Sequence, residues 1–190
     1  MQVNFDNFLI RPLSAEDLLQ YFKLIETNRK RLEDFFVGTV SKTMTIEDTA
    51  IFVQEILKKA DQRTYFPFLI VNTSENSLVG FIDIKNIDWN IPKAEIGCYI
   101  DQEYANKGIS KKAISLFTQF CFSNFKFNKL FLRTHKSNHA AQKVAESCGF
   151  ELEGTIRRDY KTTAGELVDL LYYGKLSPEY TLLTSFQLTR

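Results

Sequence analysis

Cysteine, proline and an excess of either charge are all scarce in this sequence. Its three cysteines, Cys98, Cys121 and Cys148, are too few and too scattered for a disulfide framework, which indicates free thiols in a reducing compartment. With 24 basic and 23 acidic residues the formal net charge is +1, so the whole protein has no strong attraction to nucleic acid or to an anionic membrane. We therefore expect no DNA partner and no membrane partner.

The sequence also lacks long hydrophobic runs, a targeting segment and a set of metal ligands. No apolar run approaches the ~18 residues of a membrane-spanning helix, and the stretch Met1–Asp6 lacks a basic region followed by an apolar core. A cytoplasmic location is therefore expected. The two histidines, His135 and His139, fall where a strand is expected to end and a helix to begin, with no cysteine or carboxylate cluster beside them, so we predict no metal site.

Apolar and aromatic side chains, in contrast, are abundant. Hydrophobic residues make up 44% of the 190 positions and 17 residues are phenylalanine, a composition typical of a folded chain. A chain of this length can bury a sizeable core. No low-complexity linker and no internal repeat divides it. We expect a single domain over residues 1–190.

Capping signals mark two helices in the first third of the chain. Phe8–Leu13 is predicted as a strand, and Ser14 then begins a helix with Asp17 at its third position. Thr45 with Asp48 repeats this capping pattern before a second set of apolar residues at helical spacing.

Strands and helices alternate over the rest of the chain. The predicted strands are Tyr65–Val71, Leu78–Ile87, Ala94–Ile100, Lys129–Thr134, Glu151–Tyr160 and Leu167–Lys175. The predicted helices are Lys111–Phe125 and Asn138–Ser147, the second ending at the C′ glycine Gly149. The resulting order, β-α-α-β-β-β-α-β-α-β-β, predicts an α/β fold with helices flanking a mixed sheet.

A strand, a glycine-containing loop and a helix follow one another between residues 95 and 125. Consecutive backbone N–H groups in such a loop, with the positive end of the helix dipole behind them, favour a phosphate or pyrophosphate. No proline lies between Tyr104 and Lys112, so each residue there keeps its N–H donor. The predicted phosphate-binding residues are Asn106, Lys107, Gly108, Ile109, Ser110, Lys111 and Lys112. The alternative is an ordinary connection with solvated lysines.

Several further motifs stand in a fixed order around this loop. They are Ile10-Arg11-Pro12, Asn28-Arg29-Lys30-Arg31-Leu32, Ala105-x-x-Gly108-x-Ser110, Asn138-His139-Ala140-Ala141, Cys148-Gly149-Phe150 and Glu153-Gly154. With them the sequence resembles the GNAT superfamily of acetyl-CoA-dependent N-acetyltransferases, and within it the RimJ/RimL type, from about Phe8 to Tyr180. That type acetylates N-terminal amines of ribosomal proteins and includes many small-amine acetyltransferases. The resemblance implies a GNAT-like, mixed and mostly antiparallel sheet flanked by helices.

The resemblance also implies roles for residues that would bind acetyl-CoA, the acyl donor. The strand that ends at Cys98, Tyr99 and Ile100 would offer backbone hydrogen bonds to the pantetheine arm and an N–H to the thioester oxygen. The loop would hold the pyrophosphate. Asn138 would hydrogen-bond the donor where two strands move apart, although asparagine is equally a good N-cap for the helix that follows.

A general base is predicted among the carboxylates of the central strands. Glu95 is favoured because it precedes Cys98 on the strand expected to line the cleft, and it could deprotonate an ammonium directly or through water. The alternative is that Glu95 pairs with a nearby lysine or arginine. Asp83, Glu166 and Asp169 are rivals, since side chains of their strands could reach the same cleft.

The sequence departs from its family where a general acid is expected. Many relatives have a tyrosine seven residues after the asparagine, and RimL-like members have a serine three residues after it. Here these positions are Ala145 and Ala141, which cannot donate a proton. CoA would then leave as a thiolate, or with help from water or Cys148. Ala105 and Ser110 also differ from the family's loop pattern.

The acceptor is predicted only as a primary amine: a small amine, or a peptide or protein N-terminus such as that of a ribosomal protein. Phe35–Thr43 has no periodicity and is predicted to be a mobile loop over the acceptor site, with Phe36, Tyr65, Phe66 and Trp89 as possible walls. The alternative function is a catalytically silent acyl-CoA-binding module, which the two alanines favour. A nucleotide-binding regulator is disfavoured by the lack of a Walker-type or dinucleotide glycine motif. We expect a monomer or a homodimer.

Overall fold

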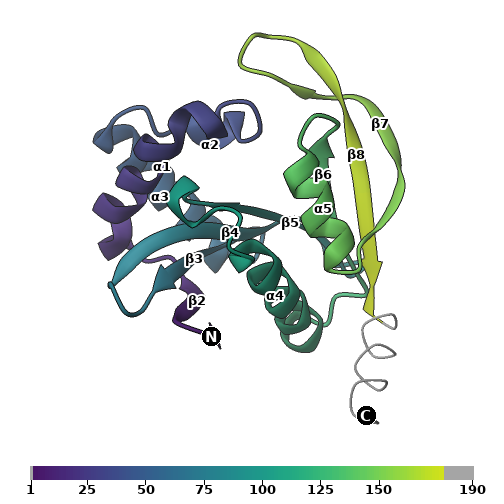
Figure 1. The fold of residues 1–190 in the computed structure, drawn as a ribbon, viewed down its shortest axis with the longest axis horizontal. Helices are drawn as coiled ribbons and strands as arrows, with labels where there is room; N and C mark the ends of the chain where they lie inside the picture. The colour runs from purple at the N-terminus through teal and green to yellow at the C-terminus, as the bar shows by residue number, and fades with distance from the viewer. Residues whose placement is uncertain (1, 178–190) are drawn as a thin grey trace.

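The computed structural model describes residues 2–177, and within them eight strands form one sheet (Figure 1). The strands are β1 (Val3–Phe5), β2 (Phe8–Pro12), β3 (Phe66–Asn72), β4 (Ser77–Asp88), β5 (Lys93–Ile100), β6 (Lys129–His135), β7 (Glu151–Lys161) and β8 (Leu167–Leu176). Their spatial order is β1-β2-β3-β4-β5-β6-β8-β7. Neighbouring strands are antiparallel except for β5 and β6, which are parallel. The predicted mixed, mostly antiparallel sheet is confirmed.

Helices cover both faces of this sheet. They are α1 (Leu18–Leu32), α2 (Val37–Val40), α3 (Ile46–Asp61), α4 (Ile109–Phe125) and α5 (His139–Ser147), with short 3₁₀ turns η1 (Ala15–Asp17) and η2 (Gln102–Tyr104). One core joins α4 and α5 to the sheet through side chains such as Phe117 and Ala145. A second core joins α1 and α3 to the opposite face through Tyr21 and Val53. In the described residues, no helix is both long enough and apolar enough to cross a bilayer.

The capping signals are found where the sequence placed them. The Thr45 hydroxyl accepts from the Asp48 N–H at 3.0 Å, and the Asp48 carboxylate accepts from the Thr45 N–H, at the start of α3. Ser14 and Asp17 also pair, because the Asp17 carboxylate accepts from the Ser14 N–H at 2.8 Å and from its hydroxyl at 2.9 Å. The turn they open is η1, and α1 follows it at Leu18. Local side-chain chemistry therefore determined both helix starts.

A strand and a helix, both short, were absent from the sequence prediction. β1 is a three-residue strand that pairs with β2 at the sheet edge. The segment Phe35–Thr43, predicted as a mobile loop, contains the four-residue helix α2. Arg29 fixes this segment because its guanidinium donates to the carbonyls of Val40 at 3.3 Å and Thr43 at 2.6 Å. Elements this short carry too little periodicity to be recognised in a sequence.

The feature of the fold that creates a site is the divergence of β5 from β6. The two strands pair only at Lys93–Lys129, Ala94–Leu130 and Glu95–Phe131. Beyond Glu95 the remainder of β5 is paired with β4 but not with β6. The sheet is therefore open between the ends of two adjacent parallel strands.

The β7–β8 hairpin forms the far end of the sheet and extends beyond it (Figure 1). Its outer strand β7 is almost entirely exposed. Tyr160, near the end of β7, accepts a hydrogen bond of 2.9 Å from the backbone N–H of Val37 at the start of α2. This contact joins the hairpin to the helical segment on the other side of the opening.

Candidate active site

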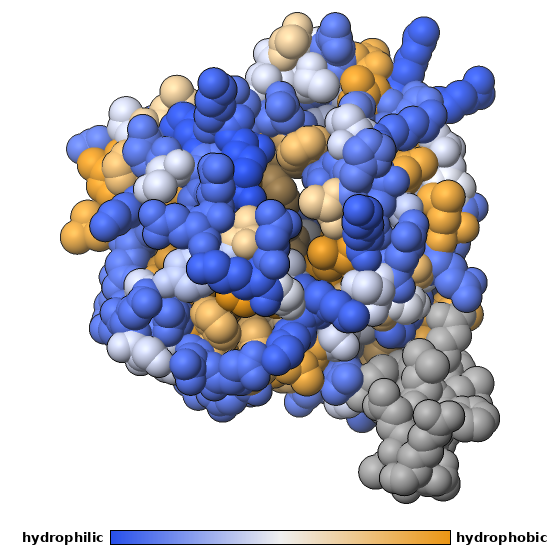
Figure 2. Space-filling view, in the orientation of Figure 1, coloured by the Kyte–Doolittle hydropathy of each residue, from blue (hydrophilic) through white to orange (hydrophobic). Residues whose placement is uncertain are grey.

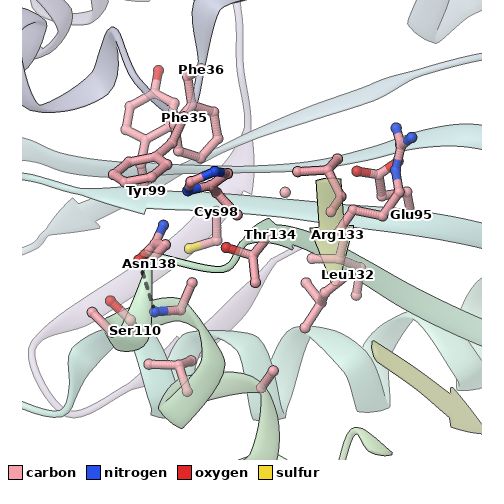
Figure 3. A pocket seen from close by; sticks show the side chains of 18 of the residues that line it. Phe35, Phe36, Glu95, Cys98, Tyr99, Ser110, Leu132, Arg133, Thr134 and Asn138 are labelled. Atoms are coloured by element: carbon pink, nitrogen blue, oxygen red, sulfur yellow. Dashed lines mark hydrogen bonds and ion pairs between the residues drawn. The ribbon is translucent and has the colours of Figure 1, made fainter. Parts of the chain in front are cut away.

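A cavity of about 520 Å³ fills the opening between β5 and β6 (Figure 3). Its hollow lies near the centre of the face shown in Figure 2, with both apolar and hydrophilic side chains at its rim. The walls come from the end of α1 and the segment after it, from β5 and β6, from α4 and α5, and from β7 and β8. Because strand side chains alternate between the faces of a sheet, the cavity has one side against α4 and α5 and another against α1 and α2.

The α5 side of the cavity contains small and apolar groups with a few polar atoms. Its lining residues are Ile96, Cys98, Ser110, Ile114, Leu132, Thr134, Asn138, Ala141, Val144 and Ala145. Three of the predicted donor-binding residues, Cys98, Ser110 and Asn138, are thus brought together here from β5, α4 and the start of α5.

The backbone of Cys98 is directed into the opening. The N–H of Asp101 donates to the carbonyl of Val79 in β4 at 2.7 Å. Along a strand, the N–H and C=O groups of successive residues point alternately to the two sides. Because Asp101 points to β4, the backbone groups of Ile100 and Cys98 point away from β4 and toward the opening. The Ile100 carbonyl there already accepts from the Arg31 guanidinium. Of these two residues, Cys98 is therefore the one whose backbone groups are available to a molecule in the cavity.

The predicted phosphate loop has the geometry of a helix start with free amides. Gly108 is the N-cap of α4 with φ of 77°, and Asn106 has φ of 61°. The first intrahelical bond runs from the Lys112 N–H to the Gly108 carbonyl at 3.1 Å, so the preceding N–H groups of the turn remain available to an anion. Ser110 reaches the cavity, whereas the Ile109 side chain is buried in the α4/α5 core.

The lysines of this loop are not all free. Lys107 Nζ lies 5.1 Å from the centre of the Tyr104 ring. Lys112 Nζ lies 2.7 Å from the Asp6 carboxylate, and both of these side chains are more than half exposed. An exposed pair of this kind contributes little to stability, so Lys112 can exchange Asp6 for another anion at small cost.

Asn138 performs the capping role and still lines the cavity. Its Oδ1 accepts from the Ala141 N–H at 3.1 Å, the dashed line in Figure 3. Because the Asn138 oxygen is used for the cap, its Nδ2 group is the part of the amide that can donate to a ligand. The two roles considered from the sequence are therefore compatible.

The α1 side of the cavity contains Glu95, which is only 5% exposed. Its Oε2 accepts from Asn86 Nδ2 at 2.6 Å and from Arg133 Nε at 3.0 Å, and Arg133 Nη2 lies 2.8 Å from it in the ion pair. Partial burial opposes the charge of Arg133, but the carboxylates of Glu95 and Asp159 outweigh this and raise its pKa. The pairing of Glu95 with a cation, raised as an alternative from the sequence, is present, and the carboxylate lines the cavity as well.

The rival carboxylates are held elsewhere. Asp83 accepts from the Tyr65 hydroxyl at 2.6 Å and from the Gly97 N–H at 2.9 Å. Asp169 accepts from the Arg158 N–H at 3.0 Å and pairs with Lys136, and Glu166 lies in the hairpin turn. Among the described residues, Glu95 is the one of these four carboxylates that lines the cavity.

The absence of a side chain at Gly97 leaves space for the charged groups of neighbouring residues on β4. A Cβ atom at Gly97 would lie 2.5 Å from Asp83 Oδ1 and 2.7 Å from Lys85 Nζ. Lys85 Nζ in turn lies 3.6 Å from Asp83 and 4.0 Å from Glu95 Oε1. The missing side chain at Gly97 thus makes room for the ion pairs that run from β4 to β5.

Aromatic rings close the α1 side of the cavity, and Figure 3 shows Phe35, Phe36 and Tyr99 grouped there. The rings of Phe36 and Tyr99 lie 5.0 Å apart. The Tyr99 hydroxyl hydrogen-bonds that of Tyr21 at 3.3 Å, and burial raises the pKa of both. Of the four aromatic walls suggested from the sequence, Phe36 lines the cavity, whereas Trp89 stacks on Phe127.

Sequence reasoning missed several cavity residues. Arg31, Arg133, Thr134 and Tyr160 line it. Arg31 lies within the motif of residues 28–32 but was given no role, and the other three belong to no motif. Arg133 and Thr134 lie on the predicted strand 129–134, whose alternation could have assigned them to opposite faces.

Cys148, considered as an aid to thiolate departure, does not line the cavity, because its Sγ donates to the Lys111 carbonyl at 3.4 Å in the core. In the part of the chain that the structure describes, His, Cys, Asp and Glu side chains form no group that could hold a metal.

This fold and cavity define the class of protein, an α/β acetyltransferase. Residues 7–151 match the model of the acetyltransferase (GNAT) domain, and the chain belongs to that family. The family membership expected from the motifs is thereby confirmed.

Relatives with names agree with this assignment. The chain is 30% identical over 177 residues to "Putative ribosomal N-acetyltransferase YdaF" of Bacillus subtilis, with 92% of this chain and 94% of that protein covered. It is 24% identical over 151 residues to the spermidine N(1)-acetyltransferase of Escherichia coli K12, covering 80% of this chain and 76% of that one. The structure of RimL, the ribosomal L7/L12 α-N-protein acetyltransferase in complex with coenzyme A, has the same fold, with a TM-score of 0.86 at 17% identity over 93% of this chain and 98% of that chain.

Proposed function

We propose that this protein transfers the acetyl group of acetyl-CoA to a primary amine, either a peptide or protein N-terminus or a small amine. The observation that carries the proposal is the cavity through the sheet where β5 and β6 diverge. A donor on the α5 side and an acceptor on the α1 side can meet there without crossing a strand. Holding the two reactants in this way supplies much of the rate of a bimolecular transfer.

Groups on the α5 side suit a thioester linked to a pyrophosphate. The Cys98 N–H, directed into the opening, would donate to the thioester oxygen, where negative charge develops. The amides of Asn106–Lys112 at the start of α4 would hold the pyrophosphate, with the positive end of the helix dipole behind them. Asn138 Nδ2 would donate to the pantetheine arm.

Glu95 is the proposed base. An alkyl ammonium has a pKa near 10, so only about one acceptor in a thousand is neutral at pH 7. In the described residues all the hydrogen bonds to Glu95 reach Oε2, which leaves Oε1 with the Lys85 ammonium at 4.0 Å. Oε1 is therefore the atom placed to take the proton, directly or through water, while Arg133 orients the carboxylate.

Relatives favour an amine acceptor but differ in its kind. YdaF carries the name of a ribosomal acetyltransferase, and the Escherichia coli relative carries that of a spermidine acetyltransferase. A ribosomal-protein N-terminus and a small amine therefore both belong in the test.

A catalytically silent acyl-CoA-binding module is the second candidate. Ala141 and Ala145 both line the cavity, at the positions where relatives carry an acid. These two alanines favour the silent module, so the experiment has to distinguish CoA binding alone from catalysis.

Thiol release from acetyl-CoA, measured with and without amines, tests the proposal. The panel contains peptides with different N-terminal residues, spermidine and free amino acids, and calorimetry with CoA is run in parallel. Release that depends on an amine supports the acetyltransferase. CoA binding without release by any amine supports the silent module. The absence of CoA binding would refute both.

A further inference from the structure

We propose that Thr134 donates a hydrogen bond to the CoA sulfur as it departs, in place of the acid that the family carries at the positions of Ala141 and Ala145. This inference rests on the proposed function, because it needs CoA in the cavity between β5 and β6. It assigns a catalytic role to a residue outside every motif of the sequence.

Thr134 lies directly across the opening from Cys98. The parallel pairing of β5 with β6 ends at Glu95–Phe131. Continuing that register by three residues on each strand brings Cys98 opposite Thr134, and Figure 3 shows the Thr134 oxygen pointing toward the Cys98 sulfur. A thioester whose oxygen is held by the Cys98 N–H places its sulfur, bonded to the same carbon, in the space between these two residues.

Thr134 is largely buried, and its hydroxyl has no partner within the described residues. Thr134 is 9% exposed, and no hydrogen bond within residues 2–177 involves its Oγ1. A cavity-lining hydroxyl without a protein partner is a donor that a ligand in the cavity can use. A departing thiolate is such an acceptor, and a hydrogen bond to a charged group is stronger than one to a neutral group.

Other polar groups of the α5 side are less suited to this task. Burial raises the pKa of Cys98 to about 12, and a thiol is a weak donor. The Asn138 oxygen accepts from Ala141, and Cys148 lies outside the cavity in the core. His135 Nδ1 is 2.6 Å from the Ser137 hydroxyl at the exposed end of β6.

The step balances without a protein acid. The amine nitrogen forms a bond to the acetyl carbon, and the C–S bond breaks with its electron pair left on sulfur. The proton lost by the amine goes to Glu95 or to water, and CoA departs as its thiolate. Thr134 keeps its own proton and stabilises the negative sulfur through the hydrogen bond. This hydrogen bond is stronger in the transition state, where the sulfur carries negative charge, than in the neutral thioester, and such a difference is what accelerates a reaction.

The test measures the pKa of the CoA thiol while CoA is bound. The ultraviolet absorbance of the thiolate is followed against pH, and the same protein with desulfo-CoA, which lacks the sulfur, is subtracted to cancel tyrosines and cysteines. Because a donor to the thiolate lowers its pKa, Thr134→Val should raise the pKa of bound CoA by about one unit or more, a tenfold change in the acid dissociation constant. Thr134→Ser should keep the wild-type value.

Controls separate this inference from the proposed function and from misfolding. Thr118→Val removes another buried threonine hydroxyl, on α4 and outside the cavity, and should leave the titration unchanged. Thr134→Ala repeats the test if the valine variant fails to fold. Equal pKa values for bound CoA in the wild type and in a folded variant without the hydroxyl would refute the role of Thr134. Failure of the wild type to bind CoA would refute the proposed function instead.

Discussion

Arg133 holds Glu95 by a hydrogen bond from Nε at 3.0 Å and an ion-pair contact from Nη2 at 2.8 Å, and it also pairs with Asp159 on β7. Residues of three strands, β5, β6 and β7, therefore form one chain of ion pairs around this carboxylate. An ion pair that is only partly exposed keeps a defined geometry better than a surface pair does. Glu95 thus lines the cavity with Oε2 held, while Oε1 accepts no hydrogen bond from the described residues.

Replacing Glu95 with Gln is expected to affect rate much more than CoA binding. Glutamine keeps the shape but cannot take a proton, and loss of a general base costs on the order of a hundredfold. We expect turnover at pH 7 to fall at least about tenfold and to recover partly as pH rises, with the Kd for CoA within a factor of about two. Asp169→Asn, which changes a carboxylate outside the cavity, is the matched control. Full activity of Glu95→Gln would remove Glu95 from the mechanism.

A methyl group at Gly97 is expected to destabilise the protein. The new Cβ would lie 2.5 Å from Asp83 Oδ1, and Asp83 is held by Tyr65 and by the Gly97 N–H, so it cannot move without losing hydrogen bonds. We expect Gly97→Ala to lower the free energy of unfolding by ~1–3 kcal/mol, measured by urea denaturation. Gly154→Ala on β7 meets nothing within 4 Å and should change it by less than ~0.5 kcal/mol. Equal stability of the two variants would show that the charges at Gly97 move freely.

CoA affinity is expected to depend on Gly108 through backbone conformation. A Cβ there meets nothing within 4 Å, but the φ of 77° is one that β-branched residues rarely adopt. Gly108→Val should therefore move the amides at the start of α4 and weaken CoA binding at least about tenfold by calorimetry. Gly165→Val introduces the same strain, at φ of 86°, in the β7–β8 turn, and its CoA affinity should match the wild type. Unchanged affinity in folded Gly108→Val would place the pyrophosphate elsewhere.

Acid stability is expected to depend on Asp17. Burial opposes its charge, but hydrogen bonds from Arg11 and Ser14 prevail and lower its pKa in the folded state. A carboxyl whose folded pKa is depressed stabilises the protein above its unfolded pKa of ~3.9, and this stability is lost as pH falls through the folded value. Asp17→Asn should therefore show a shallower loss of unfolding free energy below about pH 4 than the wild type. Parallel pH profiles would contradict this.

Local signals predicted the elements of this fold, whereas long-range relationships determined the site. The capping signals at Ser14 and Thr45 act within a few residues, so the sequence alone located them. The left-handed conformation of Gly108 was not predicted. The divergence of β5 from β6 and the pairing of Glu95 with Arg133 join residues distant in the chain. Such pairings depend on register between strands, which a single sequence does not contain.

The Tyr160 hydroxyl is expected to affect the acceptor and not the donor. It accepts from the Val37 N–H at 2.9 Å, and this bond joins the β7–β8 hairpin to α2 beside the aromatic side of the cavity. Tyr160→Phe keeps the ring but loses a bond worth about 1 kcal/mol, so the α2 segment should open more often. We expect faster amide exchange in residues 37–40 and a severalfold rise in the acceptor KM, with CoA affinity unchanged.

A neighbouring tyrosine provides the matched control for this last substitution. Tyr172 on β8 stacks on Phe131 with ring centres 4.7 Å apart, and in the described residues its hydroxyl takes part in no hydrogen bond. Tyr172→Phe removes the same atom from the adjacent strand and should leave both amide exchange at α2 and the acceptor KM at wild-type values. If the two variants behave alike, the bond from Val37 to Tyr160 does not hold α2 in place, and the acceptor side of the cavity is closed by the aromatic packing of Phe36 on Tyr99 instead.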